Sequence, residues 1–366
     1  MAAMDTRMKA KFFASIVATM AVFGAAQAQG VPDAARIDQV IQAHVAKHPF
    51  MGTVLVAKGG TVILDRAYGY ASLETMAPMT TDTSFRIGSM TKQFTAAAIL
   101  LLDERKMLKT GDLISSYLPN LPADWNAITV HDLLAHTSGI ANFTSQPGYT
   151  TLQTHAVSPQ DDLALIRDKP LDFRPGSRWA YSNTNYILLG MIIEKVSGQS
   201  YKDFVDVNLI RPVGMAETFV ATGSGAPPLQ ANGYLEGKHG LEKAAYVDMS
   251  VPYAAGAMVS TTHDLLLWEK ALFGGKVLSQ ATLVKMTTVY KSGYGYGLFI
   301  HPARERNTIE HAGNINGFNS AMAYYPNDDL IIIVLDNIEG TAADDIEGKI
   351  ARLFSRAISD KMDAGG

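Results

Sequence analysis

The residues with the clearest capacity for chemistry are a serine and a lysine three positions apart, Ser89 and Lys92. Residues three apart share one face of a helix, so the lysine amine can lie beside the serine hydroxyl. A serine is a weak nucleophile until a neighbour accepts its proton, and lysine can do this only when it is uncharged. Burial in an apolar helix wall favours the uncharged amine. The pair therefore predicts a nucleophilic serine beside a basic lysine.

The tetrapeptide alone is weak, because about one S-x-x-K is expected by chance in a chain of this length. Its other interpretation is a helix N-cap serine with an exposed lysine. Two observations favour catalysis. The motif occurs once, and the helix expected over Met90 to Leu102 has hardly any polar face on which Lys92 could be solvated. The positive end of that helix also favours negative charge on a carbonyl oxygen at Ser89.

A second candidate element is Tyr181-Ser182-Asn183, on a loop before an apolar helix. The phenol of Tyr181 can move a proton between serine and leaving group, especially where a nearby cation lowers its pKa. The amide of Asn183 can hold a substrate carbonyl or orient Lys92. A packed aromatic and a turn residue are the plainer interpretation. Either a neutral lysine or a tyrosinate would serve as the base, so the sequence leaves that choice open.

A third candidate element is His311-Ala312-Gly313, at the end of a strand expected over 307–310, with Asn314 after it. Gly313 would let a substrate backbone lie against an edge strand, and a following N–H could complete an oxyanion hole with that of Ser89. His311 can exchange protons near neutrality, although a strand-end histidine is usually structural. Ala312, Gly313 and Asn314 join Asn183 as expected substrate-binding residues.

The elements that must position these residues divide into strands at both chain ends and helices between them. Two β-branched runs, 53–57 and 61–67, flank a Gly-containing turn and predict a hairpin. Period-two segments recur over 294–301, 307–310, 318–325 and 330–336, with a turn over 326–329. Helical spacing is found over 34–47, 90–102, 130–136 (opened by Thr129 and closed by Gly139), 160–167, 185–196, 201–209, 262–272 and 342–359.

This order predicts an α+β fold: one antiparallel sheet built from both chain ends with flanking helices, and an inserted all-α lobe. The α/β lobe is expected over 32–88 and 285–362, and the α lobe over 89–284. Together they form one expected domain, residues 29–366.

The first 28 residues are expected to be a signal peptide. They combine a basic start, an apolar run over 12–26 and an A-x-A signal over 26–28, with cleavage after Ala28. The remainder carries 28 basic and 34 acidic residues and no cysteine. This composition argues against nucleic acid as a partner and leaves no disulfide or thiolate site. No later stretch is long and apolar enough to anchor the chain, so we expect a periplasmic or secreted protein without a stable membrane anchor.

Taken together and in this order, the three elements resemble those of the penicillin-recognising serine enzymes: class C β-lactamases, D-alanyl-D-alanine carboxypeptidases and related esterases. The resemblance extends to 133–139, to 211–215 and to 254–256, and covers about residues 36–355. It implies the β-lactamase/transpeptidase-like fold and catalysis by Ser89, Lys92, Tyr181 and His311, without metal or organic cofactor.

The third element departs from the K-T-G of efficient β-lactamases, because His311 and Ala312 offer a titratable cation and no hydroxyl. This puts recognition of a substrate carboxylate in doubt, unless Arg174 or Arg178 supplies the charge. A literal K-T-G at 109–111 falls at a helix end and is interpreted as a chance match.

The expected activity is hydrolysis through an acyl-enzyme on Ser89, on a D-alanyl peptide or amide or on a β-lactam. A carboxylesterase and a non-catalytic penicillin or muropeptide receptor are the alternatives. Ser138 is explained by helix capping, no G-x-S-x-G is present, and no metal-ligand spacing is found.

Overall fold

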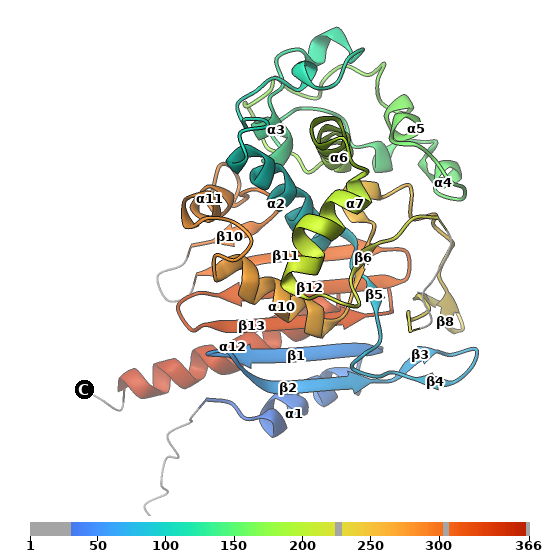
Figure 1. The fold of residues 1–366 in the computed structure, drawn as a ribbon. Helices are drawn as coiled ribbons and strands as arrows, with labels where there is room; N and C mark the ends of the chain where they lie inside the picture. Colours follow the sequence, from blue (N-terminus) through green and yellow to red (C-terminus); the bar gives the residue numbers. More distant parts are fainter. Residues whose placement is uncertain (1–30, 224–228, 303–306, 364–366) are drawn as a thin grey trace, which may run out of the picture.

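The computed structural model describes residues 31–223, 229–302 and 307–363, the last eight of these by their backbone alone. The expected signal peptide therefore lies outside the described residues. The largest sheet has six strands in the order β10-β11-β12-β13-β1-β2 (Figure 1). These strands are β1 (Gly52–Lys58), β2 (Thr61–Tyr68), β10 (Phe299–His301), β11 (Thr308–Ile315), β12 (Phe318–Tyr325) and β13 (Leu330–Asp336).

The two chain ends meet in the middle of this sheet, where β1 pairs antiparallel with β13 and Leu55 lies opposite Ile333. The hairpin of β1 and β2 turns at Gly59 and Gly60, whose φ angles of 55° and 76° favour glycine. All the pairings in the sheet are antiparallel. The predicted α+β fold, with a sheet assembled from both ends, is confirmed.

Both faces of the sheet are buried, and alternate residues of each strand enter different apolar clusters. Val54 of β1 lies on the face covered by α1 (Ala34–Val45) and α12 (Ala342–Asp363), whereas its neighbour Leu55 lies on the other face. The same alternation along β13 explains why its sequence is apolar throughout. Helix α10 (Thr262–Phe273) contacts β13 and β1. The sheet is thus a rigid middle layer on which a site can be built.

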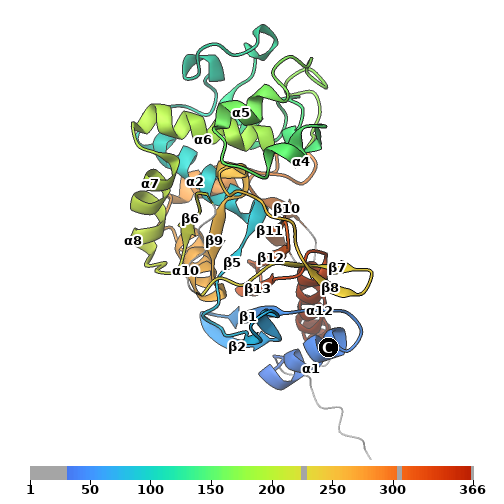
Figure 2. The same cartoon turned by 90° about the vertical axis from the view of Figure 1, so that its right-hand side faces the viewer.

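A helical region sits at one end of this layered part, with α4, α5 and α6 gathered there in both views and α3 beside them in the first (Figures 1 and 2). Helix α2 (Thr91–Glu104) contacts α6, α7, α9 and α11 and is buried along almost its whole length. The other helices are α3 (Val130–Leu134), α4 (Tyr149–Leu152), α5 (Pro159–Ala164), α6 (Asn183–Ser197), α7 (Tyr201–Val205), α8 (Arg211–Val213), α9 (Tyr253–Gly256) and α11 (Gln280–Met286).

Short strands that were not predicted occur within the expected α lobe and just before it, over residues 70–86. Each has only two to four residues, too few for a period-two pattern to reveal it. A three-stranded sheet has the order β5-β9-β6, and two hairpins pair β3 with β4 and β7 with β8. The bounds are β3 (Tyr70–Ser72), β4 (Ala77–Pro78), β5 (Phe85–Arg86), β6 (Phe219–Val220), β7 (Tyr234–Gly237), β8 (Gly240–Lys243) and β9 (Met258–Ser260).

Two boundaries near the expected site differ from the prediction. The strand expected from Tyr294 begins only at Phe299, because Gly297 takes a φ of 71° and lies so close to α2 that an added Cβ would be 2.7 Å from the Lys92 carbonyl oxygen. Strand β11 continues past Glu310 to Ile315, because β12 supplies a pairing partner for every residue from Ile309 on. Tertiary pairing overrides the low strand propensity of its Gly and Asn residues.

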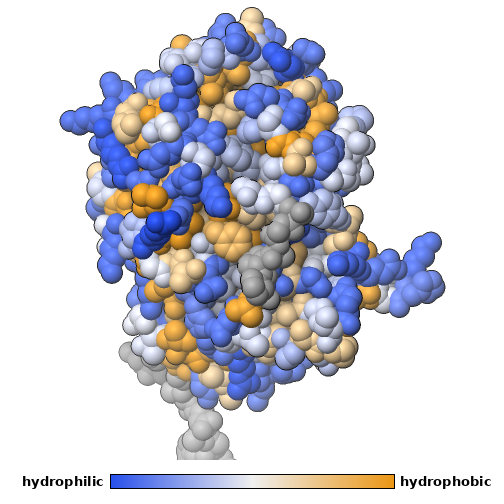
Figure 3. Space-filling model, turned by 45° about the vertical axis from the view of Figure 1, so that its right-hand side comes forward, coloured by the Kyte–Doolittle hydropathy of each residue, from blue (hydrophilic) through white to orange (hydrophobic). Residues whose placement is uncertain are grey.

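On the face turned forward in Figure 3, hydrophilic and hydrophobic side chains are interspersed, and the hydrophobic ones gather in small groups. Among the described residues, no helix has the length and apolar character needed to cross a bilayer.

Candidate active site

Ser89 lies in a short 3-10 turn, Gly88–Met90, that leads directly into α2. It is therefore within the first helical turn and not one residue ahead of it, and N–H groups of a first turn have no partner inside the helix. Gly88 precedes it with a φ of 50°, and an added Cβ there would be 3.1 Å from the backbone nitrogen of Asn314 on β11. This close approach places the serine against the sheet.

Lys92 is fully buried, with its amine at the centre of a hydrogen-bonded cluster. Its Nζ lies 3.0 Å from Ser89 Oγ, 2.8 Å from Asn183 Oδ1 and 2.8 Å from the carbonyl oxygen of Ala255. Burial lowers the pKa of Lys92 well below its usual value. A neutral amine has two N–H groups and one lone pair. Because the amide and the carbonyl can only accept, they take both N–H groups, and the lone pair is left for the serine proton.

Tyr181 approaches Ser89 from the other side, with Oη 2.7 Å from Oγ. Burial raises the pKa of Tyr181 well above its usual value. The sequence had raised the case of a nearby cation that lowers this pKa. Lys92 lies 4.7 Å from the ring centre, but burial dominates for Tyr181 and lowers the pKa of Lys92 as well. Tyr181 is therefore a phenol that donates a proton. Of the two bases that the sequence left open, the surroundings favour Lys92.

Asn183 is the first residue of α6, and its amide is held in one orientation. Its Nδ2 donates to Thr144 Oγ1 over 3.2 Å, and its backbone N–H donates to Asn142 Oδ1 over 3.0 Å. The amide oxygen therefore faces Lys92. Of the two roles considered from the sequence, orientation of Lys92 is supported by this direct hydrogen bond. Asn183 also lines both pockets that include Ser89.

His311 lies inside β11 and is buried, so it is not the titratable cation expected from the sequence. Its Nδ1 donates to the carbonyl oxygen of Ala312 over 2.6 Å, and its Nε2 accepts from Tyr294 Oη over 3.2 Å. Burial lowers the pKa of His311 to about 3. The imidazole is therefore neutral, and both of its nitrogens are used. The expectation of a proton carrier near neutrality is wrong because the imidazole is buried, with the rings of Tyr294 and Phe299 beside it.

Ala312, Gly313 and Asn314 form a strand edge beside Ser89. Strand β10 pairs with β11 only as far as Glu310, which leaves this edge without a neighbouring strand among the described residues. At Gly313, an added Cβ would be 2.1 Å from the carbonyl oxygen of Ile87 and would push β11 away from the serine turn. Glycine is required here so that the strand can approach Ser89.

Two pockets open on either side of Ser89. One, of about 210 Å³, is lined by Phe143, Tyr149, Asn183, Asn314 and Glu339 among others. The other, of about 580 Å³, has Tyr181, Phe299, His301, Glu310, His311 to Asn314 and Asp344 in its wall. The structure therefore brings together all eight predicted site residues, although Lys92 is buried behind the serine and lines neither pocket.

The other candidate residues considered from the sequence do not line these pockets. Lys109, Thr110 and Gly111 line neither of them and lie in the turn after α2, as the chance-match interpretation predicted. Arg174 and Arg178 are also absent from both linings, and the Arg178 guanidinium lies over the Phe173 ring at 5.3 Å. The capping explanation for Ser138 is wrong, because α3 ends at Leu134; its hydroxyl instead donates to Asn185 Oδ1 over 2.6 Å.

Sequence reasoning missed His136, whose ring packs against that of Tyr181. Helix α3 ends at Leu134, earlier than the end at His136 that was predicted, and His136 takes a φ of 55°. Its buried ring lies 4.5 Å from that of Tyr181, and its Nδ1 is 3.3 Å from the Ser182 backbone nitrogen. A histidine directly after a short capped helix was the available signal. The carbonyl of Ala255 was also missed, because a backbone acceptor leaves no mark in a sequence.

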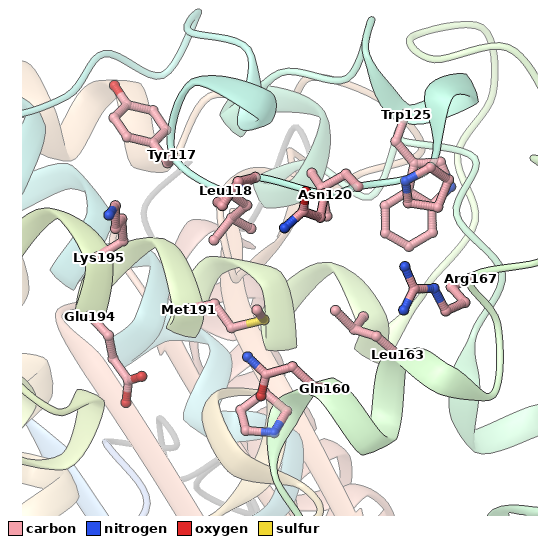
Figure 4. Close-up of a pocket in the computed structure, with 14 residues that line it drawn as sticks. Tyr117, Leu118, Asn120, Trp125, Gln160, Leu163, Arg167, Met191, Glu194 and Lys195 are labelled. Atoms are coloured by element: carbon pink, nitrogen blue, oxygen red, sulfur yellow. The ribbon is translucent and has the colours of Figure 1, made fainter.

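A separate cavity of about 600 Å³ lies in the helical region, between the segment 117–125, α5 and α6 (Figure 4). Its wall includes Leu118, Trp125, Leu163 and Met191, and none of the predicted site residues. Among the described residues, no group of three or more His, Asp or Glu side chains has a geometry that could hold a metal ion.

The fold and the site define the class of serine hydrolases in which a lysine three residues after the nucleophile lies at its side. The chain matches the family model described as Beta-lactamase over residues 37–356, and it belongs to this family, whose members are serine hydrolases.

Several relatives extend the comparison. Penicillin-binding protein 4* of Bacillus subtilis is 31% identical over 315 residues, 80% of this chain and 69% of that protein. A penicillin binding protein from Bacillus halodurans has a TM-score of 0.79 at 26% identity, covering 87% of this chain and 99% of that one. The D-amino acid amidase from Ochrobactrum anthropi SV3 has a TM-score of 0.77 at 26% identity, covering 90% and 98%.

Proposed function

We propose that this chain is an exported hydrolase that cleaves amide bonds next to D-amino acid residues through an acyl-enzyme on Ser89. The observation that carries the proposal is the position of Ser89 Oγ between a neutral amine 3.0 Å away and a phenol 2.7 Å away. One neighbour can accept the serine proton and the other can protonate a leaving group.

In the first half of the reaction, Lys92 accepts the proton of Ser89 while Oγ attacks the carbonyl carbon. The negative oxygen is stabilised by the backbone N–H of Ser89 and by an N–H of the segment after Gly313. Tyr181 protonates the leaving nitrogen and regains a proton from the Lys92 ammonium. The net result is that the serine proton leaves with the amine. Water then attacks the acyl-enzyme, passes a proton through the same pair and restores Ser89.

In the proposed mechanism, Asn183 and His311 position other groups and do not exchange protons themselves. Asn183 holds the amine of Lys92 so that its lone pair faces Ser89. His311 fixes the strand edge through its bond to the Ala312 carbonyl and exchanges no proton itself.

The preference for D-residue amides is supported by the relatives. One neighbour was solved as a D-amino acid amidase complexed with D-phenylalanine, and another as a D-stereospecific amidohydrolase from Streptomyces. The bacillar relatives are penicillin-binding proteins by name. Export is supported by the basic start, apolar run and A-x-A signal of residues 7–28.

The decisive experiment is intact-mass measurement after incubation with a penicillin or a fluorophosphonate, on the wild type and on Ser89→Ala. An adduct on the wild type and none on the variant is expected, and an adduct on both would refute Ser89 as the nucleophile. Turnover is then compared on a D-alanyl amide, p-nitrophenyl butyrate and nitrocefin. Stable penicillin labelling without turnover of any substrate would identify a receptor instead of an enzyme.

Export has a separate test. The chain is expressed in a Gram-negative host, and the periplasmic fraction is analysed by mass. A species beginning at Gln29 is expected there, and a full-length species in the cytoplasm would contradict export.

A further inference from the structure

The larger pocket beside Ser89 has an acidic wall. Glu310 on β11 and Asp344 in the first turn of α12 both line it, and none of the described residues in its wall is a lysine or an arginine. Both histidines of the wall have partners. His311 is buried and neutral, and His301 is already paired with Glu310 through its Nε2, 3.1 Å from Oε1.

The two carboxylates are held in place and are near each other. Asn319 Nδ2 donates to Asp344 Oδ2 over 3.0 Å. Burial raises the pKa of Glu310, His301 opposes this, and the negative charge of Asp344 adds to it. The second carboxylate oxygen of Glu310 has no hydrogen-bond partner among the described residues. A wall of this kind attracts a positive group and repels a negative one.

The position of Tyr181 shows which part of a substrate enters this pocket. Tyr181 lines the acidic pocket and not the smaller pocket across Ser89. Since Tyr181 is the proton donor to the leaving nitrogen in the proposed mechanism, the leaving group must lie on the Tyr181 side. The group that meets Glu310 and Asp344 is therefore the leaving amine and whatever it carries.

We propose that Glu310 and Asp344 form a subsite for a cationic leaving group, so that the preferred substrates are amides or peptides whose leaving amine carries a second, positively charged amino group. This rests on the proposed function of Ser89. A leaving residue with a free carboxylate is disfavoured by the same charges, which turns the site away from a terminal D-alanine and toward amidase chemistry.

The test uses three substrates with one acyl part, N-acetyl-D-alanine, and leaving amines of similar size that differ in charge. These are D-alanine, its neutral amide, and 1,2-diaminopropane, in which an ammonium replaces the carboxylate. Release of N-acetyl-D-alanine is followed by mass. We expect kcat/KM for the cation to exceed that for the carboxylate by about tenfold, because Asp344 is exposed and the Glu310 side chain is 37% exposed, so that solvent partly screens both charges.

The matched variants are E310Q/D344N, which removes both charges with little change of shape, and D345N, which removes a neighbouring charge outside the lining of this pocket. The double variant should bring the cation and carboxylate substrates within about threefold of each other, while D345N keeps the wild-type order. Thermal unfolding of E310Q/D344N establishes that it is folded.

Equal rates on the three substrates in the wild type would overturn the proposal, as would a preference for the carboxylate or an unchanged preference in E310Q/D344N. Fluorophosphonate labelling of the wild type separates these failures from a failure of the proposed function. If the wild type is labelled but its rates do not depend on the charge of the leaving amine, only the cationic subsite is refuted. If the wild type is not labelled, Ser89 is refuted as the nucleophile.

Discussion

Replacing Asn183 by aspartate tests the assignment of Lys92 as the base. The change keeps the size of the side chain and puts a negative charge where the amide oxygen now lies, 2.8 Å from Lys92 Nζ. Thr144, which now accepts a bond from the amide nitrogen over 3.2 Å, can donate its hydroxyl to the new carboxylate. The local geometry is therefore retained, and the change acts mainly on the charge of Lys92.

The size of the effect follows from the distance. Unit charges at this separation attract by on the order of 4 to 6 kcal/mol at an effective dielectric of about 20. If about half of that remains after the cost of burying the carboxylate, Lys92 must give up roughly 2 to 3 kcal/mol to lose its proton. At about 1.4 kcal/mol per tenfold change in rate, kcat/KM near neutral pH should fall about a hundredfold.

The pH profile separates this cause from simple damage to the site. Only neutral Lys92 can accept the serine proton, so activity is present above the pKa of Lys92 and is lost as the pH falls through it. A carboxylate raises this pKa and moves the acidic limb of kcat/KM to higher pH, so that Asn183→Asp regains activity in alkaline buffer.

Asn142→Asp is the matched control. It places the same charge one hydrogen bond further from Lys92, because Asn142 contacts the backbone N–H of Asn183. The acidic limb of kcat/KM should therefore move less in Asn142→Asp than in Asn183→Asp. The assignment of Lys92 fails if Asn183→Asp loses activity equally at every pH, or if its limb stays with that of the wild type.

Three further changes address the other parts of the site. Tyr181→Phe keeps the ring packing but removes the Oη donor to Ser89, and we expect acylation by a penicillin, followed by stopped-flow or mass, to slow by about a hundredfold or more; an unchanged rate would show that another group protonates the leaving nitrogen. Gly313→Ala forces a Cβ against the Ile87 carbonyl oxygen, 2.1 Å away, and should lower the free energy of unfolding by about 1 to 3 kcal/mol in a urea titration as well as reduce turnover; wild-type values of both would show that β11 can move away freely. His311→Gln should lower kcat but leave the shape of the pH profile between about pH 5 and 8 unchanged, because the histidine is neutral throughout that range; disappearance of a limb near neutrality would show that His311 exchanges protons after all.

Part of the candidate site could be predicted from the sequence, because the contact between Ser89 and Lys92 depends on a short spacing. Ser89 and Lys92 are one helical turn apart, so their contact is local and follows as soon as a helix forms. The apolar residues around Lys92 indicated burial, and burial is what lowers its pKa. The strands over 318–325 and 330–336 were predicted with the bounds that β12 and β13 have, because each is a long run between clear turn signals.

Contacts between distant segments could not be read with the same certainty. Resemblance indicated that Tyr181 and His311 belong to the site, but only the three-dimensional arrangement shows one as a protonated phenol on Ser89 and the other as a buried neutral imidazole. A pKa depends on which groups surround a side chain, and for both residues these come from elsewhere in the chain.

By itself the amino-acid sequence determined the fold class and the contact between Ser89 and Lys92, since these follow from apolar periodicity and from residues within one helical turn. Only the tertiary structure places Tyr181 and the buried Lys92 on Ser89, buries His311 so that its pKa is lowered, and brings Glu310 and Asp344 into the pocket that Ser89 and Tyr181 line. These depend on the electric field and solvation at a point in space, and segments hundreds of residues apart contribute to both.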